Sequence, residues 1–256
     1  MYKYLIFEKQ AVNIGILRIN RPDVLNALNY LLLEELLDFL EKTAVNEKCK
    51  AIILTGAGEK SFIAGADIKE MNEFSALQML GFCELGQKVT FALEKASYLS
   101  IAAINGYALG GGLEMALACD FIYASKNAKM GSPEVHLGII PGFGGSHRLS
   151  RAIGTRKAKE LIMSGRTFNA NEAFEMGIVN KVCPEESLLK ECITVANEII
   201  ENSMTAVLQV KNAINCCSQM GIVEALELER NMCAVCFATE DRVKGMGNFL
   251  EKHGRR

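Results

Sequence analysis

The stretch GYALGGGLEMALACD, residues 106–120, places three consecutive glycines and one carboxylate at the head of an otherwise apolar segment. The residues before it, LSIAAIN at 99–105, have the apolar and β-branched character of a buried strand. Glycine is a poor helix former, so its use at a helix start needs a separate explanation. We predict a strand, a turn and a helix, with Glu114 in the first turn of that helix.

Outward from this stretch, strand and helix patterns alternate along the first half of the chain. Strands are expected at 4–9, 13–20, 50–56, 99–106 and 120–125, and helices at 28–45 and 75–96. This order is typical of an α/β domain. Beyond Gly165 the apolar spacing becomes mostly helical, and no low-complexity linker intervenes. We divide the chain into a core, residues 1–195, and an α-helical C-terminal region, residues 196–256.

The composition indicates a globular protein that does not use a basic surface. The chain has 256 residues, half of them hydrophobic, and a formal net charge of −2. It contains no dense run of Lys and Arg, so nucleic acid and membrane surfaces are not expected as partners. The uncharged segment 96–113 reaches the length of a membrane span, but its polar residues and glycines favour a strand, a turn and a helix start.

The nine cysteines follow no disulfide framework, and the N-terminus MYKYLIFEKQ is too short and too charged for a signal peptide. We therefore expect a reducing compartment, the cytoplasm. Cys233 and Cys236 have C-x-x-C spacing, and Cys216 and Cys217 lie upstream, which raises the question of a zinc site. Because the neighbouring pair is not half of a zinc ribbon and both pairs lie in helical patterns, no metal is expected.

Glycine-rich segments also raise the question of a phosphate loop. Neither GYALGGGLE nor PGFGGSHRL has the spacing or the lysine of a G-x-x-x-x-G-K-[ST] loop, and neither follows the G-x-G-x-x-G pattern. Only three histidines are present, His136, His147 and His253, and no G-x-S-x-G or H-E-x-x-H motif occurs. Phosphate-loop, triad and zinc-protease chemistry are therefore not expected.

Glu114 allows two explanations from its own stretch. Its sequence neighbours are apolar, which predicts burial on most sides, and a buried carboxyl must be paired, protonated or directed into a cleft. One explanation is an acid that complements the positive N-terminus of a helix. The other is an acid beside a free backbone N–H near Gly111 that can face a developing oxyanion.

Two further segments bear on this choice. In SFIAGADIKEM, residues 61–71, an apolar strand ends in small residues before Asp67, which fits a helix N-cap. In MGSPEVHLGIIPGFGGSHRL, residues 130–149, Ser132, Pro133 and Glu134 fit the N-cap, N1 and N2 positions of a short helix. Taken singly, each segment is explained by helix capping.

Taken together, four segments resemble the crotonase superfamily of enoyl-CoA hydratases and isomerases, and most of all its short-chain enoyl-CoA hydratase branch. The segments are FIAGADIKEM, NGYALGGGLEMALACD, GSPEVHLGIIPGFGGSHRL and FATEDRVKGMGNFLEK, in family order and at family-like spacing. The resemblance implies an α/β fold, a spiral of ββα units with an α-helical C-terminal trimerisation region. It also implies a homotrimer or a homohexamer formed as a dimer of trimers.

The resemblance assigns roles to four residues of the site. The backbone N–H groups of Ala66 and Gly111 form an oxyanion hole for a thioester carbonyl, and small residues there allow close approach. Glu114 is the base toward water, and Glu134 donates a proton to C2. The implied reaction is the reversible hydration of a trans-2-enoyl-CoA to a 3-hydroxyacyl-CoA, with no cofactor apart from the coenzyme A of the substrate.

The resemblance also implies a set of substrate-binding positions. Lys69 and Lys252 are candidates for the CoA phosphates, with Phe249 beside Lys252, although ordinary solvated lysines explain both equally well. Met71 and the helix at 75–96 are expected to wall the acyl pocket. The full set is Ala64, Asp67, Ile68, Lys69, Met71, Gly142, Phe249 and Lys252.

Two other functions stay open at this point. The first is a Δ3,Δ2-enoyl-CoA isomerase or another acyl-CoA lyase of the superfamily, which the presence of both glutamates disfavours. The second is a non-catalytic or RNA-binding relative, which the acidic balance and the intact glutamate pair disfavour.

Overall fold

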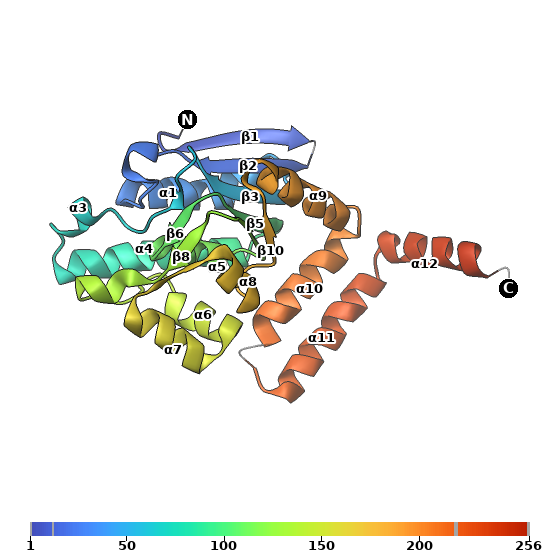
Figure 1. Cartoon of the computed structure of the whole chain (residues 1–256). Coiled ribbons are helices and arrows are strands. Elements are labelled where there is room, and N and C mark those ends of the chain that lie inside the picture. The colour runs from blue at the N-terminus through green and yellow to red at the C-terminus, as the bar shows by residue number, and fades with distance from the viewer. Residues whose placement is uncertain (1, 12, 218–219, 255–256) are drawn as a thin grey trace. The chain divides into compact units, whose positions relative to one another are not determined.

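The computed structural model describes residues 2–11, 13–217 and 220–254 (Figure 1). The chain separates into two compact units, residues 1–195 and 196–256. Within the described ranges, no helix combines the length and the apolar content needed to cross a membrane.

In the described part of the first unit, six strands form one sheet in the order β1–β2–β3–β5–β7–β10 (Figure 1). The first two strands are an antiparallel pair, and the other neighbours run parallel. Every residue of β3 and β5 is buried, as expected for parallel strands covered on both faces. The strands are β1 (Leu5–Ala11), β2 (Ile14–Ile19), β3 (Ala51–Gly56), β5 (Leu99–Ile104), β7 (Phe121–Ser125) and β10 (Lys181–Cys183).

The crossover helices have clear start signals in the sequence. Asn29 caps α1 (Tyr30–Asp38) by accepting the N–H of Leu32, and the helical path continues through a π-helical turn, η2 (Phe39–Thr43), into α2 (Ala44–Asn46). Ser75 and Gln78 form a capping box at the start of α4 (Ala76–Glu94). The helices expected at 28–45 and 75–96 are therefore confirmed.

The described part of this unit contains further helices, all shorter than α4. They are η1 (Pro22–Val24), α3 (Ile68–Met71), α5 (Gly111–Leu117), η3 (Pro133–Leu137), α6 (Gly145–Ile153), α7 (Thr155–Ser164), α8 (Ala170–Glu175) and η4 (Glu185–Ser187); α9 (Leu188–Ile200) crosses the boundary between the units.

A second sheet of four short strands was not expected from the sequence, although the apolar strand before Ala64 was. In the described residues it has the order β4 (Ser61–Ile63), β6 (Tyr107–Leu109), β8 (Lys129–Gly131) and β9 (Thr167–Asn169). The expectation that residues between Gly106 and the helix form only a turn is wrong, because Tyr107–Leu109 is a strand. Three residues are too few to show an alternating pattern, and this strand exists through its pairing with β4 and β8.

This second sheet determines where α5 begins. β6 leads directly into Gly110 and then into α5, and β4 packs against that helix. A Cβ atom at Gly112 would lie 2.0 Å from the backbone oxygen of Ile63, so only glycine allows this approach. The glycine triplet thus brings the start of α5 against the strand that leads to Ala66.

The second unit is helical, with α10 (Met204–Cys217), α11 (Ile222–Phe237) and α12 (Glu240–His253). α10 and α11 pack against each other. Ser203, just before α10, donates a hydrogen bond of 2.7 Å to Asp241 in α12. The helical character expected for this part of the chain is confirmed.

Candidate active site

One cavity of about 190 Å³ in the first unit brings the three predicted site segments together. Its wall includes the small residues before α3, the start of α5, the η3 turn and the loop before α6. The predicted site residues that line it are Ala64, Ala66, Ile68, Met71, Gly111, Glu114, Glu134 and Gly142. Apolar side chains from α4, Met79 and Phe82, complete one wall, as expected for that helix.

Gly111 is the first residue of α5, so its N–H has no partner within the helix. The preceding Gly110 has φ +50°, a left-handed conformation that glycine adopts without strain. A Cβ atom at Gly110 would also lie 3.0 Å from Oε1 of Glu134. The chain therefore turns sharply here, and the N-terminus of α5 is placed at the cavity.

The N–H of Ala66 is left free by a single parallel β-bridge to Leu28. Leu28 donates to the carbonyl of Gly65 at 2.9 Å, and Asp67 donates to the carbonyl of Leu28 at 2.8 Å. In this pattern the N–H of the central residue points to the side opposite the bridge. Among the described residues it has no acceptor, and Ala66 lines the cavity.

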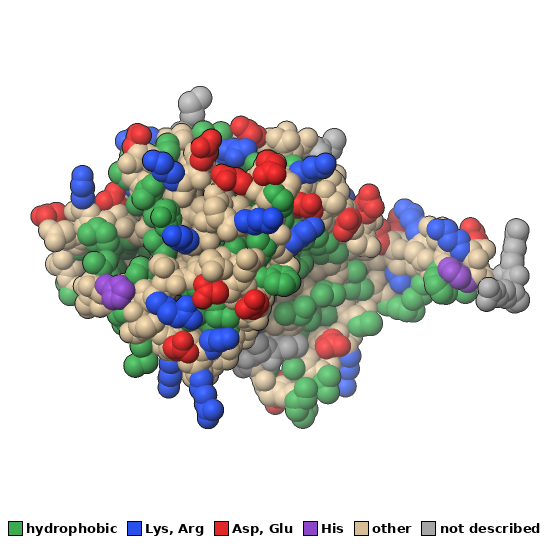
Figure 2. Space-filling model, in the orientation of Figure 1, with side chains coloured by type: hydrophobic (Ala, Val, Ile, Leu, Met, Phe, Trp, Pro, Cys, Tyr) green, Lys and Arg blue, Asp and Glu red, His purple; other side chains and the backbone are tan. Residues whose placement is uncertain are grey.

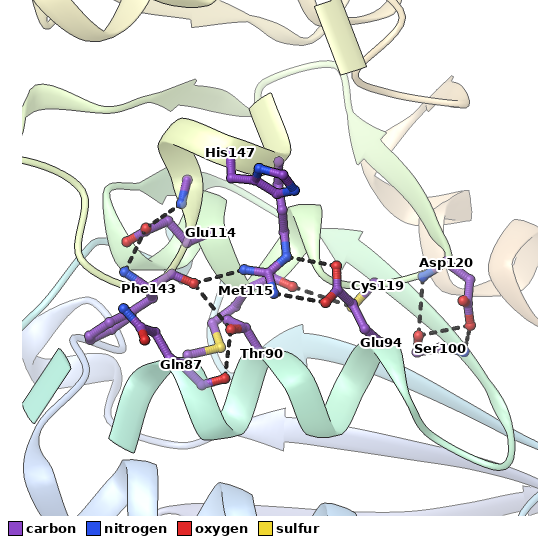
Figure 3. A network of polar contacts seen from close by, with 12 residues as sticks. Gln87, Thr90, Glu94, Ser100, Glu114, Met115, Cys119, Asp120, Phe143 and His147 are labelled. Carbon is purple, nitrogen blue, oxygen red and sulfur yellow. Dashed lines mark hydrogen bonds and ion pairs between the residues drawn. The ribbon is translucent and has the colours of Figure 1, made fainter. Parts of the chain in front are cut away.

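Glu114 projects from the first turn of α5 and is 2% exposed. Its Oε1 accepts the N–H of Phe143 at 2.8 Å and the N–H of Gly145 at 2.6 Å (Figure 3). The pKa of Glu114 is raised to about 7, chiefly by burial; the nearby Glu134 carboxyl also raises it, whereas the two N–H groups and Arg148 act in the opposite direction. The group is therefore poised to exchange a proton near neutral pH.

Glu134 lies in the first turn of η3 and differs from Glu114 in its hydrogen bonding. Both of its carboxyl oxygens are buried, and neither has a hydrogen-bond partner among the described residues. Burial raises the pKa of this carboxyl. Buried polar groups are nearly always bonded, so an unbonded acid that lines a cavity marks a candidate catalytic group.

The family model described as enoyl-CoA hydratase/isomerase matches residues 9–255. The chain belongs to the enoyl-CoA hydratase/isomerase family. It is 46% identical over 253 residues to crotonyl-CoA hydratase of Syntrophomonas wolfei, covering 98% of this chain and 96% of that protein. It is 45% identical over 248 residues to short-chain-enoyl-CoA hydratase of Clostridium acetobutylicum, covering 97% of this chain and 95% of that protein.

The fold of this enoyl-CoA hydratase/isomerase family member matches solved structures along its whole length. The crystal structure of enoyl-CoA hydratase from Bacillus anthracis superposes with a TM-score of 0.93 at 39% identity, covering 98% of this chain and 97% of that one. The expected family and the expected α/β fold class are thereby confirmed.

In this family member the side chain of Asp67 contacts the backbone and Arg21 and does not line the cavity. It caps α3 by accepting the N–H of Lys69 at 3.2 Å, as the helix-capping explanation predicted, and forms an ion pair of 3.0 Å with Arg21. It does not line the cavity, and neither does Lys69, which is exposed on α3. Asp67 thus fixes the chain immediately after the Ala66 donor.

Two predicted substrate-binding residues lie in the second unit. Phe249 is 62% exposed on α12, and its ring stacks on His253. Lys252 is exposed in the last turn of the same helix.

Ser132 occupies the position before η3 that the sequence predicted, but its side chain forms no capping hydrogen bond. Its ψ of 78° lies well short of the extended value of a capping residue, whereas the predicted N-cap position itself is confirmed.

Three residues that support the site were not singled out from the sequence: Glu94, Phe143 and Arg148. Arg148 is buried on α6 together with Gly145 and Leu149. These positions have the i, i+3, i+4 spacing of a buried helical face, so an arginine within that pattern was the available signal.

No metal centre is found in the part of the chain that the structure describes, where no three His, Cys, Asp or Glu side chains are grouped to hold an ion. Cys216, Cys233 and Cys236 are free thiols there. The side chain of Cys217 lies outside the described residues.

Proposed function

We propose that the chain is an enoyl-CoA hydratase, a hydro-lyase that adds water reversibly to a trans-2-enoyl-CoA. The observation that carries the proposal is the pair of buried carboxyls, Glu114 and Glu134, in the wall of one cavity. Full-length similarity to hydratases at 45–46% identity supports it. Adding water to a double bond requires one group that activates the water and a source of the second proton, and two acids supply both.

In this proposal the N–H groups of Ala66 and Gly111 hold the thioester oxygen. Negative charge moves onto that oxygen when water attacks C3, and two preorganised N–H donors stabilise the charge. Both donors lie in the cavity wall without acceptors among the described residues. Because the donors are main-chain groups, exchanging the side chain of Ala66 does not remove its donor.

The two carboxyls then divide the proton transfers. Glu114 takes a proton from the water as its oxygen bonds to C3, and Glu134 gives a proton to C2, so that the elements of one water are added. The absence of hydrogen bonds to Glu134 favours its neutral form, whereas two N–H donors stabilise the charged form of Glu114. The carboxyls are neighbours and titrate as a pair.

The decisive experiment follows the loss of enoyl absorbance of crotonyl-CoA. We expect hydration by the wild-type protein and a fall in kcat of about 10²- to 10⁴-fold in Glu114→Gln, because a positioned base contributes about this factor. Glu84→Gln, an exposed glutamate on α4, is the matched control and keeps full activity. No hydration by the wild type, or undiminished hydration by Glu114→Gln, contradicts the proposal.

For the acyl-CoA substrate, we propose that Lys69 and Lys252 bind the phosphates of the coenzyme, with Phe249 beside Lys252. All three side chains are exposed and therefore accessible to a large, charged ligand. The acyl group would lie against Met71, Met79 and Phe82. The acyl part in the names of the two relatives, crotonyl and short-chain, supports a short enoyl group.

We also propose a homotrimer or a homohexamer. Apolar side chains remain exposed on the helices of the second unit, where Figure 2 shows hydrophobic atoms at the surface. They include Val210, Ile214, Ile222, Val223, Leu226, Val235, Phe237, Val243, Met246, Phe249 and Leu250. Exposed apolar surface of this kind is typical of an interface between copies of a chain.

We propose the cytoplasm as the compartment. The cysteines whose side chains are described are all free, and three of them are buried. Free thiols are typical of a reducing compartment.

A further inference from the structure

The loop before α6 holds Glu114 in place. The N–H groups of Phe143 and Gly145 both end at Oε1 of Glu114, at 2.8 Å and 2.6 Å. Two donors on one oxygen fix the rotation of the carboxyl group. They leave Oε2, which has no hydrogen-bond partner among the described residues, as the oxygen that can act on a reactant.

The same loop is in turn held by its carbonyl groups. The carbonyl of Phe143 accepts Nη1 of Arg148 at 2.7 Å and the hydroxyl of Thr90 at 3.1 Å. The carbonyl of Gly142 accepts the side-chain amide of Gln87 at 2.9 Å. Figure 3 shows Gln87 and Thr90 on α4 directed at the Phe143 segment. The direction of both N–H donors therefore depends on contacts to α4 and α6.

Arg148 is itself fixed by a bidentate ion pair. Its Nε and Nη2 atoms donate to the two carboxyl oxygens of Glu94, each at 2.9 Å. The side chains of Arg148 and Glu94 are 8% and 23% exposed. A largely buried ion pair contributes little net stability compared with apolar residues of the same size. Its geometric effect, a rigid donor aimed at the Phe143 carbonyl, accounts better for its presence.

We propose that Arg148 is a positioning residue for the Glu114 carboxylate, acting through the carbonyl of Phe143 and held by Glu94. Arg148 is not part of the cavity wall, so it reaches a substrate only through this loop. The inference rests on the proposed hydratase function, in which Glu114 is the base. A displacement of that base by even 1 Å is enough to cost about 10²-fold in rate.

The charges around Glu114 determine in which direction its pKa moves when Arg148 or Glu94 is replaced. The ionisable groups that interact with this carboxyl are Glu134 on η3, Arg148 on α6 and Cys83 on α4, and Glu94 on α4 pairs with Arg148. β4 and β5 carry no ionisable side chain, and Tyr107 of β6 and His147 of α6 are exposed. Arg148 lowers the pKa of Glu114, and Glu94 offsets that effect by neutralising Arg148.

The experiment measures kcat, KM and the pH profile of crotonyl-CoA hydration for two variants. In Arg148→Met we expect kcat to fall about tenfold with KM within about twofold of wild type, because the base is displaced and binding groups are not. We also expect the acidic limb of its pH profile, the range in which activity falls as the pH is lowered, to move to higher pH than in wild type. In Glu94→Gln the acidic limb moves to lower pH, because the arginine charge is no longer neutralised. A purely structural role for the pair predicts lower stability, with the kcat of the folded variants unchanged.

Lys88→Met and Glu84→Gln are the matched controls, because they remove an exposed ion pair of 2.8 Å on the same helix α4. If Arg148→Met does not fold, Thr90→Val tests the same carbonyl with a side chain of the same shape, and we expect a smaller fall in kcat at unchanged KM. An inactive wild type overturns the hydratase proposal. An active wild type whose variants keep the wild-type kcat and acidic limb overturns the positioning role alone.

Discussion

At the scale of single residues, the two carboxyls of the cavity differ in their hydrogen bonding rather than in their chemistry. Glu114 receives two backbone N–H groups, whereas neither oxygen of Glu134 has a partner among the described residues. Burial raises the pKa of both groups. Different surroundings thus separate a proton acceptor from a proton donor within one pair of identical side chains.

The pH dependence of activity follows from the raised pKa of Glu114. The base must be ionised, so kcat/KM falls as the pH is lowered through about 7, rather than through the ordinary value of 4.5. Initial rates with crotonyl-CoA between pH 5 and pH 9 measure this limb. Glu114→Gln should lose the limb, and a wild-type limb near 4.5 contradicts the assignment of Glu114 as the base.

The same shift has a consequence for stability with a defined sign. Because the folded protein binds the proton of Glu114 more tightly than the unfolded chain does, stability falls as the pH rises from 4.5 to about 7. Glu114→Gln removes this loss, since the amide oxygen still accepts both N–H groups. We expect the variant to gain stability over wild type at pH 8 but not at pH 4, as measured by urea unfolding.

At the scale of elements, a short helix and one β-bridge place the Ala66 donor. α3 has only four residues, and its start is held by the Asp67 cap and by the ion pair of Asp67 with Arg21. Arg21 also donates to the carbonyl of Ala27, next to the Leu28 bridge. Arg21 and Asp67 therefore fix both the residue after the donor and the segment that bridges it.

Replacing Asp67 should disturb the oxyanion donor as well as the helix. Asp67→Ala removes the cap and the ion pair, so we expect a loss of about 1–2 kcal/mol in unfolding free energy and a lower kcat. Asp67→Asn keeps the cap, so its unfolding free energy and its kcat should each fall less than in Asp67→Ala. The exposed pair of Glu227 and Arg230 provides a control, and Glu227→Ala should change neither quantity. Equal activity in Asp67→Ala and wild type would contradict this role.

The sequence predicts the long elements well because their signals are local. Asn29 and Ser75 cap helices where the apolar spacing begins, and β3 and β5 are continuous apolar runs. The strand Tyr107–Leu109 is not predictable in this way, because its hydrogen bonds come from β4 and β8. Short strands are specified by their partners, which are distant in sequence.

The candidate site follows the same division. Burial of Glu114 is predictable from its apolar neighbours, and the Asp67 cap from its local pattern. The ion pair that holds the loop around Glu114 is not predictable from the sequence, because Glu94 and Arg148 are 54 positions apart and meet only in the folded chain. The grouping of Ala66, Gly111 and Glu134 in one cavity came from resemblance, and the structure brings these residues together.

At the scale of the whole molecule, the two units differ in how far their apolar side chains are buried. In the first unit the apolar residues of the central strands are buried. In the second unit, the described part of α12 contains no buried residue, although it carries Val243, Phe249 and Leu250. A helix of this kind is stabilised by association when it cannot be covered within its own chain.

The oligomer proposal is tested by light scattering of the purified protein. We expect a mass three or six times the 28.0 kDa of the chain. Val223→Asp, which places a charge on a side chain that is 71% exposed, should lower the mass if that face is an interface. Lys211→Glu on α10 is a charge-changing comparison. A wild-type protein that stays monomeric at micromolar concentration contradicts the proposal.

The free N–H of Ala66 gives a way to observe the oxyanion hole without catalysis. An amide hydrogen without an acceptor exchanges rapidly with deuterium, whereas those of Leu28 and Asp67 beside it are bonded, and we expect them to exchange slowly. A bound thioester oxygen should slow exchange at Ala66 and Gly111 and leave Leu28 and Asp67 nearly unchanged. Because of the β-bridge, the amide of Ala66 can report ligand binding, and the adjacent amide of Asp67, which is already bonded, can serve as its internal reference.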